Sequence, residues 1–463
     1  MPANPAYAAA LEELDRHVNF ERSGEYPAGS GGLGTARCEE LLARLGAPEA
    51  GAPAIHVAGT KGKGSTAHLA AAALRARGWR VGLYTSPHVV CLRERIQIDG
   101  RFVSQNDFAT AFAKVREAAA AMASRPTYFE MLTAVAFVAF AEARVDAVVA
   151  EVGLGGRLDA TNLARLPVVA SCVTPISLDH TQILGDTLGK IAAEKAGILR
   201  PRTPLVLARQ TPEARQAILA RAAELACPVL EVGRDVAVEI PPIAPGAEAG
   251  RFTLRIAPGA LPRQPARELA DLPLALAGAH QRENAAAAFA LAQVFCDARE
   301  ASPVSREELA RAWKNLRVPG RLEIVGARPV IVLDGAHNPA SAWALTETLR
   351  GRFPDPGQKK VAVVSVSRDK DVREFLHVIL PCFDRVFFTA NHSGRGAAPG
   401  ELLATARELF PKRDNDWQVL DTPENALEQA LAAAGEEGMA CVTGSFYLVG
   451  DLRPRCLRVP PED

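Results

Sequence analysis

The sequence predicts an α/β fold with two domains, an N-terminal one built on a mostly parallel sheet and a smaller α/β one after it. Apolar, β-branched runs alternate with alanine-rich helical stretches along the chain. A glycine-rich turn joins the first of these runs to a helix, and the alternation starts afresh after residue 321 without a second such turn. Strands that are apolar throughout are typical of a parallel sheet with helices on both faces. We therefore expect a layered fold in each half.

The N-terminal domain is predicted from five apolar runs and the helical patterns around them. The predicted strands are residues 55–58, 81–84, 147–151, 168–174 and 205–208. The predicted helices are residues 66–77, 108–123, 130–143, 281–296 and 305–315. Residues 241–265 are rich in Pro and Gly with short apolar alternation, which predicts a hairpin-like excursion or a loop insert.

A domain boundary is predicted near residue 318, which divides the chain into 1–318 and 319–463. Beyond it the predicted strands are residues 330–333, 361–366, 385–389 and 440–443, with helices between them. This alternation predicts a Rossmann-like α/β domain. Since it has no glycine-rich turn of its own, the second domain is expected to have a task different from the first.

Composition argues against several classes of protein. The 463 residues carry 53 basic and 53 acidic side chains, and this zero net charge does not indicate binding to nucleic acid or to a membrane surface. The 8 cysteines form no C-x-x-C pair, which argues against a zinc site or a disulfide scaffold and indicates a reducing, cytoplasmic location. The longest apolar run, residues 131–141, is too short to span a bilayer, and no signal-peptide core is expected at the N-terminus.

The glycine-rich turn lies in the sequence IHVAGTKGKGST, residues 55–66. Glycine backbone, a helix N-terminus and the ammonium of Lys63 together favour a phosphate-binding loop of the P-loop type. The match to G-x-x-x-x-G-K-[ST] is imperfect, because Val57 replaces the first glycine and Gly64 moves the hydroxyl one place on, to Ser65. The alternative is an ordinary strand–helix turn. The predicted nucleotide-binding residues of this loop are Gly59, Thr60, Gly62, Lys63, Gly64 and Ser65.

Polar residues follow several predicted strands at the sheet edge where ligands of α/β folds bind. Glu151 ends a buried strand, where a carboxylate is costly unless it is paired or binds a cation. It is a candidate Mg²⁺ ligand, with Ser86 and His180 at equivalent strand ends. The alternatives are a structural hydrogen bond from Glu151 to the adjacent glycine turn, and a packed or surface role for His180.

A second glycine turn, GLGGRLDATN, covers residues 153–162. It is either a tight loop with an Asx-type turn at Asp159 or a loop that faces the substrate. Lys195 follows on a predicted helix, where a surface lysine near the helix C-terminus is the default interpretation.

In the second half, LDGAHNP at residues 333–339 places Asp334 and His337 at another strand end. Asn284 and Arg321 flank the predicted boundary. An Asp can bind a ribose hydroxyl, an Arg a phosphate and an Asn an adenine edge, so together these residues suggest a nucleotide gripped from both domains. The alternative is a turn that ends at Asn-Pro.

Nine motifs in this order resemble those of one known family. They are HVAGTKGKGST, YTSPH, TYFE, EVGLGGRLDATN, SLDHTQILG, IAAEKAGI, HQRENAA, PGR and LDGAHNP. The sequence resembles folylpolyglutamate synthase/dihydrofolate synthase, a branch of the Mur ligase superfamily, from its N-terminal helix to residue 446. The GKG form of the loop, which weakens the general P-loop match, is similar to this branch.

The resemblance implies an ATP-dependent ligase that adds L-glutamate to a folate, to dihydropteroate or to both, through an acyl phosphate. It implies an ATP-binding domain with the folate site in residues 1–318 and a glutamate-ligase domain in residues 319–463, in a monomer. By motif position, the Mg²⁺ ligands would be Ser86, Glu151, His180 and Lys195, the last as a carbamate formed with CO₂. The catalytic residues would be Lys63, His180 and Lys195. Further ATP contacts would be Asn284, Arg321, Asp334 and His337. The pterin or folate pocket would contain Phe129, Asp159 and Ala160.

Two alternatives remain open at this point. One is a Mur-type ligase that acts on a cell-wall nucleotide precursor, although GKG and TYFE favour the folate branch. The other is a P-loop ATPase or regulatory module, which leaves Arg321, Asp334 and His337 without a purpose. Lys61 has no assigned role, and a solvated charge is its simplest interpretation.

Overall fold

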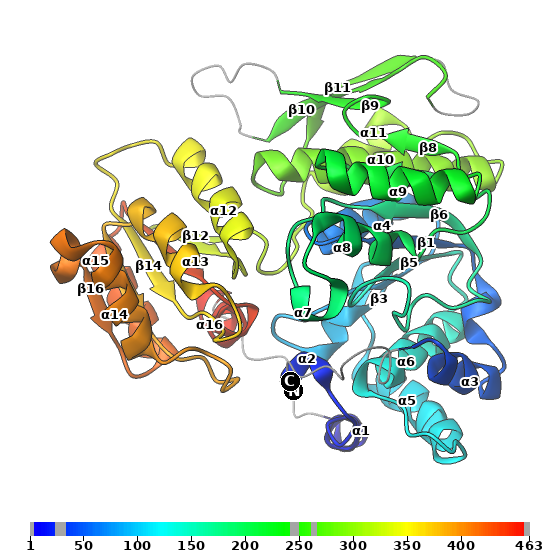
Figure 1. The fold of residues 1–463 in the computed structure, drawn as a ribbon, viewed down its shortest axis with the longest axis horizontal. Helices are drawn as coiled ribbons and strands as arrows, with labels where there is room; N and C mark the ends of the chain where they lie inside the picture. The colour runs from blue at the N-terminus through cyan, green and yellow to red at the C-terminus, as the bar shows by residue number, and fades with distance from the viewer. Residues whose placement is uncertain (1–3, 24–33, 241–249, 261–265, 458–463) are drawn as a thin grey trace. The chain divides into compact units, whose positions relative to one another are not determined.

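The computed structural model describes residues 4–23, 34–240, 250–260 and 266–457, whose fold is shown in Figure 1. The chain divides into two compact units. The first ends at Leu316 and the second continues from Arg317, while the short segments His88–Cys91 and Leu276–His280 group with the second unit. Among the described helices, none has both the length and the apolar character that a membrane span requires.

An eight-stranded sheet forms the centre of the first unit, in the order β4-β3-β2-β5-β1-β6-β7-β8. Strands β2, β5, β1, β6, β7 and β8 are parallel to one another, whereas β3 pairs antiparallel with both β2 and the edge strand β4. Every residue of β1 and β5 is buried. The bounds are β1 Ala54–Ala58, β2 Val81–Tyr84, β3 Ile96–Ile98, β4 Arg101–Phe102, β5 Ala147–Glu151, β6 Val168–Val173, β7 Leu205–Leu207 and β8 Val229–Glu231.

Helices cover this sheet because their apolar faces match its apolar strands. Helix α4 packs on β1, β2 and β5, while α8 and α9 pack together over β6 and β7. A separate cluster joins α1, α3, α5 and α6 to the β2–β5 side of the sheet. The helices are α1 Pro5–Leu14, α2 Phe20–Ser23, α3 Ala36–Arg44, α4 Lys63–Ala76, α5 Gln105–Ala120, α6 Tyr128–Glu142, α7 Thr181–Leu184, α8 Leu188–Ala196, α9 Pro212–Glu224, α10 Ala279–Ala298 and α11 Arg306–Trp313, with short 3₁₀ turns at Pro48–Gly51 and Leu92–Arg95.

A small antiparallel sheet follows, in the order β11-β10-β9. Its strands are β9 Val236–Glu239, β10 Arg251–Ile256 and β11 Arg267–Pro273. The hairpin-like excursion predicted for residues 241–265 is confirmed by β10, while residues 241–249 and 261–265 lie outside the described residues. Trp313 of α11 is fully buried, stacks on Phe252 of β10 with the ring centroids 6.2 Å apart, and donates from Nε1 to the Leu69 carbonyl of α4 at 3.1 Å. Helix α11 therefore joins the small sheet to the helix that follows the glycine-rich loop.

The second unit is a six-stranded sheet in the order β12-β13-β17-β14-β15-β16, parallel except for the antiparallel edge strand β12. One apolar cluster includes α12, α13 and α14, and another includes α15 and α16. The strands are β12 Glu323–Ala327, β13 Val330–Leu333, β14 Lys360–Val364, β15 Arg385–Phe388, β16 Trp417–Val419 and β17 Met439–Thr443. The helices are α12 Pro339–Arg352, α13 Val372–Ile379, α14 Pro399–Leu409, α15 Pro423–Ala434 and α16 Phe446–Leu457, with 3₁₀ turns at Leu380–Cys382 and Pro411–Asp416.

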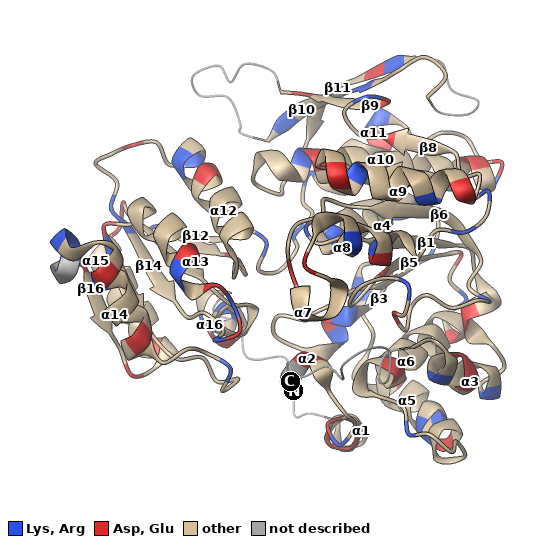
Figure 2. Cartoon of the chain, viewed as in Figure 1, with Lys and Arg blue, Asp and Glu red and all other residues tan. Residues whose placement is uncertain are grey.

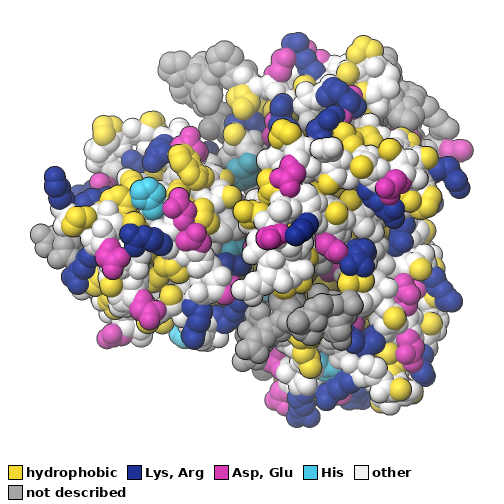
Figure 3. All heavy atoms as spheres, viewed as in Figure 1, with side chains coloured by type: hydrophobic (Ala, Val, Ile, Leu, Met, Phe, Trp, Pro, Cys, Tyr) yellow, Lys and Arg dark blue, Asp and Glu magenta, His cyan; other side chains and the backbone are white. Residues whose placement is uncertain are grey.

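The predicted α/β class is confirmed in both units. Strands β2, β5 and β13 have the predicted bounds. Helix α4 begins at Lys63, three positions before the predicted residue 66, because the left-handed Gly62 is already its N-cap. Acidic and basic side chains are interspersed over the helices of each unit (Figure 2) and lie beside one another on the face shown in Figure 3.

Candidate active site

The glycine-rich loop is shaped by two glycines with positive φ. Gly59 has a φ of 144° and Gly62 a φ of 82°. A Cβ on Gly59 would overlap the hydroxyl of Thr174, so only glycine fits there. Helix α4 starts immediately after Gly62, and no side chain caps its N-terminus. Its first backbone N–H groups are therefore directed to a position where an anion is favoured.

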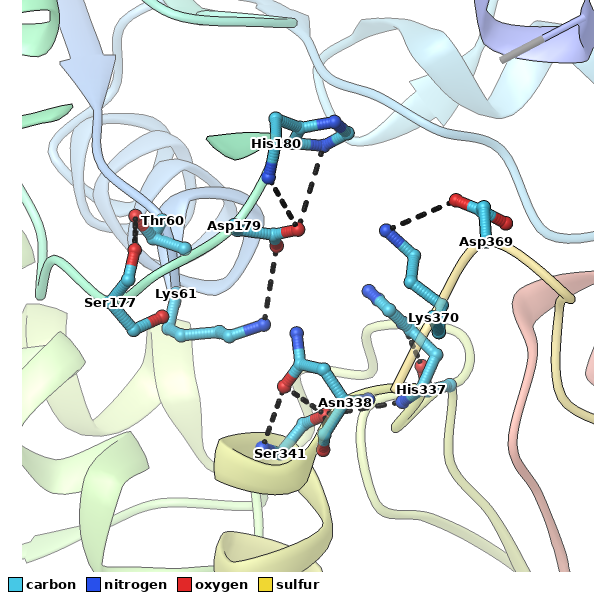
Figure 4. Close-up of polar contacts among 11 residues, drawn as sticks. Thr60, Lys61, Ser177, Asp179, His180, His337, Asn338, Ser341, Asp369 and Lys370 are labelled. Atoms are coloured by element: carbon cyan, nitrogen blue, oxygen red, sulfur yellow. Dashed lines mark hydrogen bonds and ion pairs between the residues drawn. The ribbon is translucent and has the colours of Figure 1, made fainter. Parts of the chain in front are cut away.

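The same loop is fastened to the segment that follows β6. The amides of Thr60 and Lys61 both donate to the Pro175 carbonyl at 3.1 Å. The Thr60 hydroxyl donates to the Ser177 carbonyl at 3.2 Å (Figure 4). These bonds fix the start of the loop relative to the predicted metal-ligating segment.

Asn284, the predicted adenine contact, lies against the phosphate loop. A Cβ on Gly62 would lie 2.5 Å from Asn284 Oδ1, and the Asn284 amide donates to Gln281 Oε1 at 3.0 Å within α10. Asn284 is 5% exposed. The structure thus brings α10 to the glycine-rich loop, while the contact with adenine stays a prediction.

Glu151 and Ser86 meet at the carboxyl edge of the large sheet. Glu151 ends β5, is 2% exposed, and accepts a hydrogen bond from the Ser86 amide on Oε2 at 3.1 Å. A Cβ on Gly64 would lie 3.3 Å from the same oxygen, so the carboxylate sits beside the first turn of α4. A buried carboxylate next to the uncapped N-terminus of α4 is the kind of oxygen donor that suits Mg²⁺.

His180 has a left-handed backbone with a φ of 49° and is the N-cap residue of the short helix α7. Its amide donates to Asp179 Oδ1 at 3.1 Å, and its Nε2 lies 3.9 Å from the same oxygen. Asp179 Oδ2 in turn lies 3.7 Å from the ammonium of Lys61 (Figure 4). Lys61 is therefore paired with an acid of the SLDH motif, and its interpretation as a solvated charge is wrong.

Lys195 is buried, so the default interpretation as a surface lysine is wrong. It is 4% exposed in the last turn of α8, and its ammonium lies 3.5 Å from the Gly155 carbonyl. Burial, followed by repulsion from Lys63 and Lys61, lowers the pKa of Lys195 to about 7, although Asp179 and Asp159 oppose this shift. Sequence position on a helix end did not reveal this burial, because it arises from the glycine loop that covers α8.

The loop of residues 153–162 is held by Asp159. Its Oδ2 accepts the Leu154 amide at 2.9 Å, and its Oδ1 accepts the Thr161 amide at 3.0 Å and the Thr161 hydroxyl at 2.6 Å. The predicted Asx-type turn is thus confirmed. Burial raises the pKa of Asp159 against these hydrogen bonds, which lower it.

Phe129 and Ala160 border this loop on its apolar side. A Cβ on Gly153 would lie 2.6 Å from Phe129 Cζ, and the Phe129 ring lies 5.8 Å from that of Tyr84. Ala160 is buried in the cluster against which Phe129 packs. The structure therefore groups the three predicted folate contacts, Phe129, Asp159 and Ala160, around one loop, and their binding role stays a prediction.

In the second unit, Asp334 organises the turn after β13. Its two oxygens accept the amides of Leu322 at 2.8 Å and Ala336 at 2.9 Å. Burial raises the pKa of Asp334 to about 6, although these two amides and Arg321 lower it. The Asp334 carboxylate therefore stabilises this turn through two backbone hydrogen bonds, and its contact with a ribose stays a prediction.

The other two predicted nucleotide contacts of this unit, Arg321 and His337, both lie beside the ring of Phe446. The Arg321 guanidinium lies 4.5 Å from its ring centroid, and the His337 ring lies 6.0 Å away. A Cβ on Gly335 would overlap the Phe446 ring. His337 Nδ1 lies 2.7 Å from the Gly335 carbonyl, and Asn338 caps α12 through Ser341 (Figure 4). Sequence reasoning did not give Phe446 a role, because only packing reveals it.

The arrangement suits phosphate binding beside a buried carboxylate. Among the described residues, no three His, Cys, Asp or Glu side chains gather as a metal site. The predicted Mg²⁺ set contains only two residues of these types, Glu151 and His180, so a divalent cation would also need oxygen ligands from Ser86, from a modified Lys195 and from a nucleotide.

Two protein-family descriptions match the chain. The Mur ligase middle domain matches residues 57–292, and the glutamate ligase domain of Mur ligases matches residues 320–446. A dihydrofolate synthase/folylpolyglutamate synthase of Mycobacterium tuberculosis is 34% identical over 445 residues, which cover 90% of this chain and 88% of that protein. A protein of the same name from Bacillus subtilis is 32% identical over 428 residues, covering 91% and 94% respectively.

Solved structures show the same similarity. Mycobacterium tuberculosis folylpolyglutamate synthase complexed with ADP and AMPPCP has a TM-score of 0.84 and 31% identity, and the match covers 98% of this chain and 99% of that one. E. coli FolC in complex with DHPP and ADP has a TM-score of 0.81 and 29% identity, over 98% of each chain.

Proposed function

We propose how this chain works from the premise that it belongs to the Mur ligase family, in the branch of folylpolyglutamate synthase and dihydrofolate synthase. It is an ATP-dependent ligase that joins L-glutamate to a folate, to dihydropteroate or to both. One feature of the site carries most weight: the uncapped N-terminus of α4, with Lys63 directly after Gly62, lies beside the buried carboxylate of Glu151.

ATP is assigned to the glycine-rich loop and to the residues that surround it. Residues 59–65 would hold the phosphates through backbone N–H groups and the Lys63 ammonium. Asn284 borders the same loop. Arg321, Asp334 and His337 would contact the nucleotide from the second unit. We assign the phosphate-binding loop and the folate site to residues 1–318, and glutamate ligation, together with the remaining ATP contacts, to residues 319–463.

Mg²⁺ would be held by Ser86, Glu151, His180 and a carbamylated Lys195, and when bound it would supply positive charge beside the phosphates. Lys195 suits this modification because CO₂ reacts with a neutral amine. Burial lowers the pKa of Lys195 to about 7, so the neutral amine is accessible near neutral pH. A carbamate there would present oxygens to a hard cation, whereas an ammonium presents none.

The reaction proceeds in two steps. A carboxylate oxygen of the folate substrate attacks the γ-phosphorus of ATP, the bond to the β-phosphate oxygen breaks, and ADP leaves. Lys63 stabilises the charge on the transferring phosphoryl group. The amine of L-glutamate then attacks the acyl carbon, loses a proton, and displaces inorganic phosphate to leave an amide. Phe129, Asp159 and Ala160 would position the pterin during both steps.

ADP release tests this function directly. The protein is assayed with tetrahydrofolate, dihydropteroate, a cell-wall nucleotide precursor or no acceptor, each with and without L-glutamate. We expect ADP only when L-glutamate and a folate or dihydropteroate are both present. Equal ATP hydrolysis without either substrate would show a plain ATPase, and turnover of the cell-wall precursor would show the other ligase class.

We also propose that the protein is a cytoplasmic monomer and that its partners are small-molecule substrates alone. Size-exclusion chromatography with light scattering, run with and without ATP, tests the monomer. A stable dimer under both conditions would contradict it.

A further inference from the structure

His56 is buried in the centre of the large sheet and has no role in the mechanism above. It lies on β1, where it pairs in register with Ala150 of β5 and Ser171 of β6, and its exposed fraction is 0%. Three residues further along the chain, directly after β1 ends, the predicted phosphate loop begins at Gly59. A buried imidazole at this place needs a partner, because an unpaired polar group in a core is costly.

Its partner is Thr161, in the loop that carries the predicted folate contacts. His56 Nε2 lies 2.9 Å from the Thr161 hydroxyl, and that hydroxyl lies 2.6 Å from Asp159 Oδ1. A chain of two hydrogen bonds therefore runs from the strand of the phosphate loop to the carboxylate that shapes residues 153–162.

The direction of this chain follows from counting protons. Asp159 accepts hydrogen bonds from Leu154 and Thr161 amides on both of its oxygens, as an ionised carboxylate does. Thr161 has one hydroxyl proton and donates it to Asp159. Toward His56 the hydroxyl can therefore only accept, so Nε2 of His56 must carry the proton.

The other ring nitrogen agrees with this tautomer. Nδ1 of His56 is buried and has no hydrogen-bond partner among the described residues. With the proton on Nε2, only Nδ1 is left unpaired, as an acceptor. With the proton on Nδ1, that N–H would be unpaired and Nε2 would also face the Thr161 oxygen at 2.9 Å with no proton between them. Burial, with a smaller effect of Arg200, lowers the pKa of His56 to about 3, so the ring stays neutral.

We propose that His56 is a positioning residue for the folate substrate, which orients Thr161 so that its hydroxyl holds Asp159 and the loop of residues 153–162 in place relative to the phosphate loop. The proposal rests on the proposed function, because Asp159 is there a contact of the pterin. His56 itself touches neither ATP nor substrate in this scheme. Loss of the His56 side chain should therefore weaken binding of the folate substrate and leave binding of ATP largely unchanged.

The experiment compares His56→Leu, which removes the donor, with His56→Gln, whose amide nitrogen can reach the place of Nε2. We expect His56→Leu to raise KM for the folate substrate about three- to tenfold, with KM for ATP and kcat changed less than about twofold. His56→Gln should recover most of the affinity. Ser171→Ala, which removes another buried polar group beside β1, is the matched control and should leave all three constants unchanged.

A second pair of variants tests the same chain from its middle. Thr161→Ser retains the hydroxyl and should bind the folate substrate normally, whereas Thr161→Val should lose as much affinity as His56→Leu. The double variant His56→Leu/Thr161→Val should be no worse than Thr161→Val alone. If His56→Leu does not fold, the difference in folate KM between Thr161→Ser and Thr161→Val tests the proposal instead.

Several results would overturn the proposal. They are an unchanged folate KM in folded His56→Leu, an equal rise in the KM of ATP, or additive effects in the double variant. A wild-type protein without any folate-dependent ADP release would instead show that the proposed function is wrong. The two failures are therefore distinguishable.

Discussion

The ammonium of Lys61 lies 3.7 Å from Asp179 Oδ2, and this ion pair joins the phosphate loop to the segment that carries His180. Both side chains are partly buried, at 28% and 15% exposed, so solvent screens the pair less than it would an exposed one. The Thr60 and Lys61 amides reinforce the junction through Pro175. We therefore expect Lys61 to influence the geometry of the site through Asp179.

Removing the Lys61–Asp179 ion pair should lower kcat/KM for ATP. In Lys61→Ala we expect kcat/KM for ATP to fall about threefold, and in Asp179→Asn by a similar amount, with the double variant no worse than either. Steady-state kinetics at low and high salt measure this. Lys190→Ala, which removes an exposed pair with Asp186, is the control and should change nothing. Fully additive losses would show that the two residues act independently.

Lys63→Ala should abolish ligation while the fold persists. The ammonium is expected to stabilise charge that develops on the phosphoryl group, so its loss should lower kcat at least about 100-fold. ADP release measures the rate, and circular dichroism with thermal unfolding checks the fold. Turnover close to that of the wild type would refute a phosphate role for this lysine.

Carbamylation of Lys195 should depend on pH in a defined direction. Burial lowers the pKa of Lys195 to about 7, so the ammonium dominates below this pH and the reactive amine above it. With ¹³C-labelled bicarbonate, we expect a carbamate carbon signal that is weak at about pH 6 and grows as the pH rises through 7. The signal should vanish in Lys195→Ala and persist in Lys190→Ala.

Activity offers a second check on the same residue. Lys195→Ala should lose ligation and be rescued in part by acetate or formate, whose carboxylate replaces that of the carbamate. Full activity of this variant without any added acid would contradict the modification, as would a carbamate signal that persists in Lys195→Ala.

Alanine variants of two glycines should change the free energy of unfolding in opposite directions, because one glycine is sterically confined and the other lies in an open part of a helix. Gly59→Ala places a methyl group on Thr174 at a φ of 144°, so we expect a loss of at least about 2 kcal/mol in the free energy of unfolding. Gly351→Ala, in α12, meets open space and should instead stabilise by up to about 1 kcal/mol. Urea unfolding compares the two. A neutral Gly59→Ala would show that the loop can move away from Thr174.

Asp334→Asn should affect both the fold and the nucleotide. An amide has one oxygen, so it can accept only one of the two backbone amides that Asp334 now satisfies on separate oxygens. We expect a loss of about 1–3 kcal/mol in unfolding free energy together with weaker ATP binding. Calorimetry measures both quantities. Unchanged stability would indicate that the turn is held by other contacts.

Local sequence patterns predicted most of the parallel strands, because strands such as β5 are buried on both faces and read as unbroken apolar runs. The antiparallel strands β3, β4 and β12 were not predicted, since strands that are short or only partly buried lack this signature. The helix after the glycine-rich loop begins earlier than its alanine-rich pattern predicts, because the left-handed Gly62 is its N-cap.

Residues of the candidate site were predicted as individual motifs, but their environments were not. The burial of Lys195 depends on a loop forty residues earlier, and the partner of Lys61 lies in a segment beyond β6. Phe446 acquires its role only when α16 places it beside Arg321 and Gly335. Such contacts link residues far apart in the chain, and no local pattern encodes them.

The seating of Trp313 has a consequence for synthesis on the ribosome. Its ring closes the contact between β10 and the phosphate-loop helix α4, and its N–H bonds the Leu69 carbonyl. Helix α4 is made more than two hundred residues earlier than this partner. The nascent chain must therefore carry an incompletely covered helix α4 until residue 313 leaves the exit tunnel, which makes this interval the one in which chaperone binding would matter most.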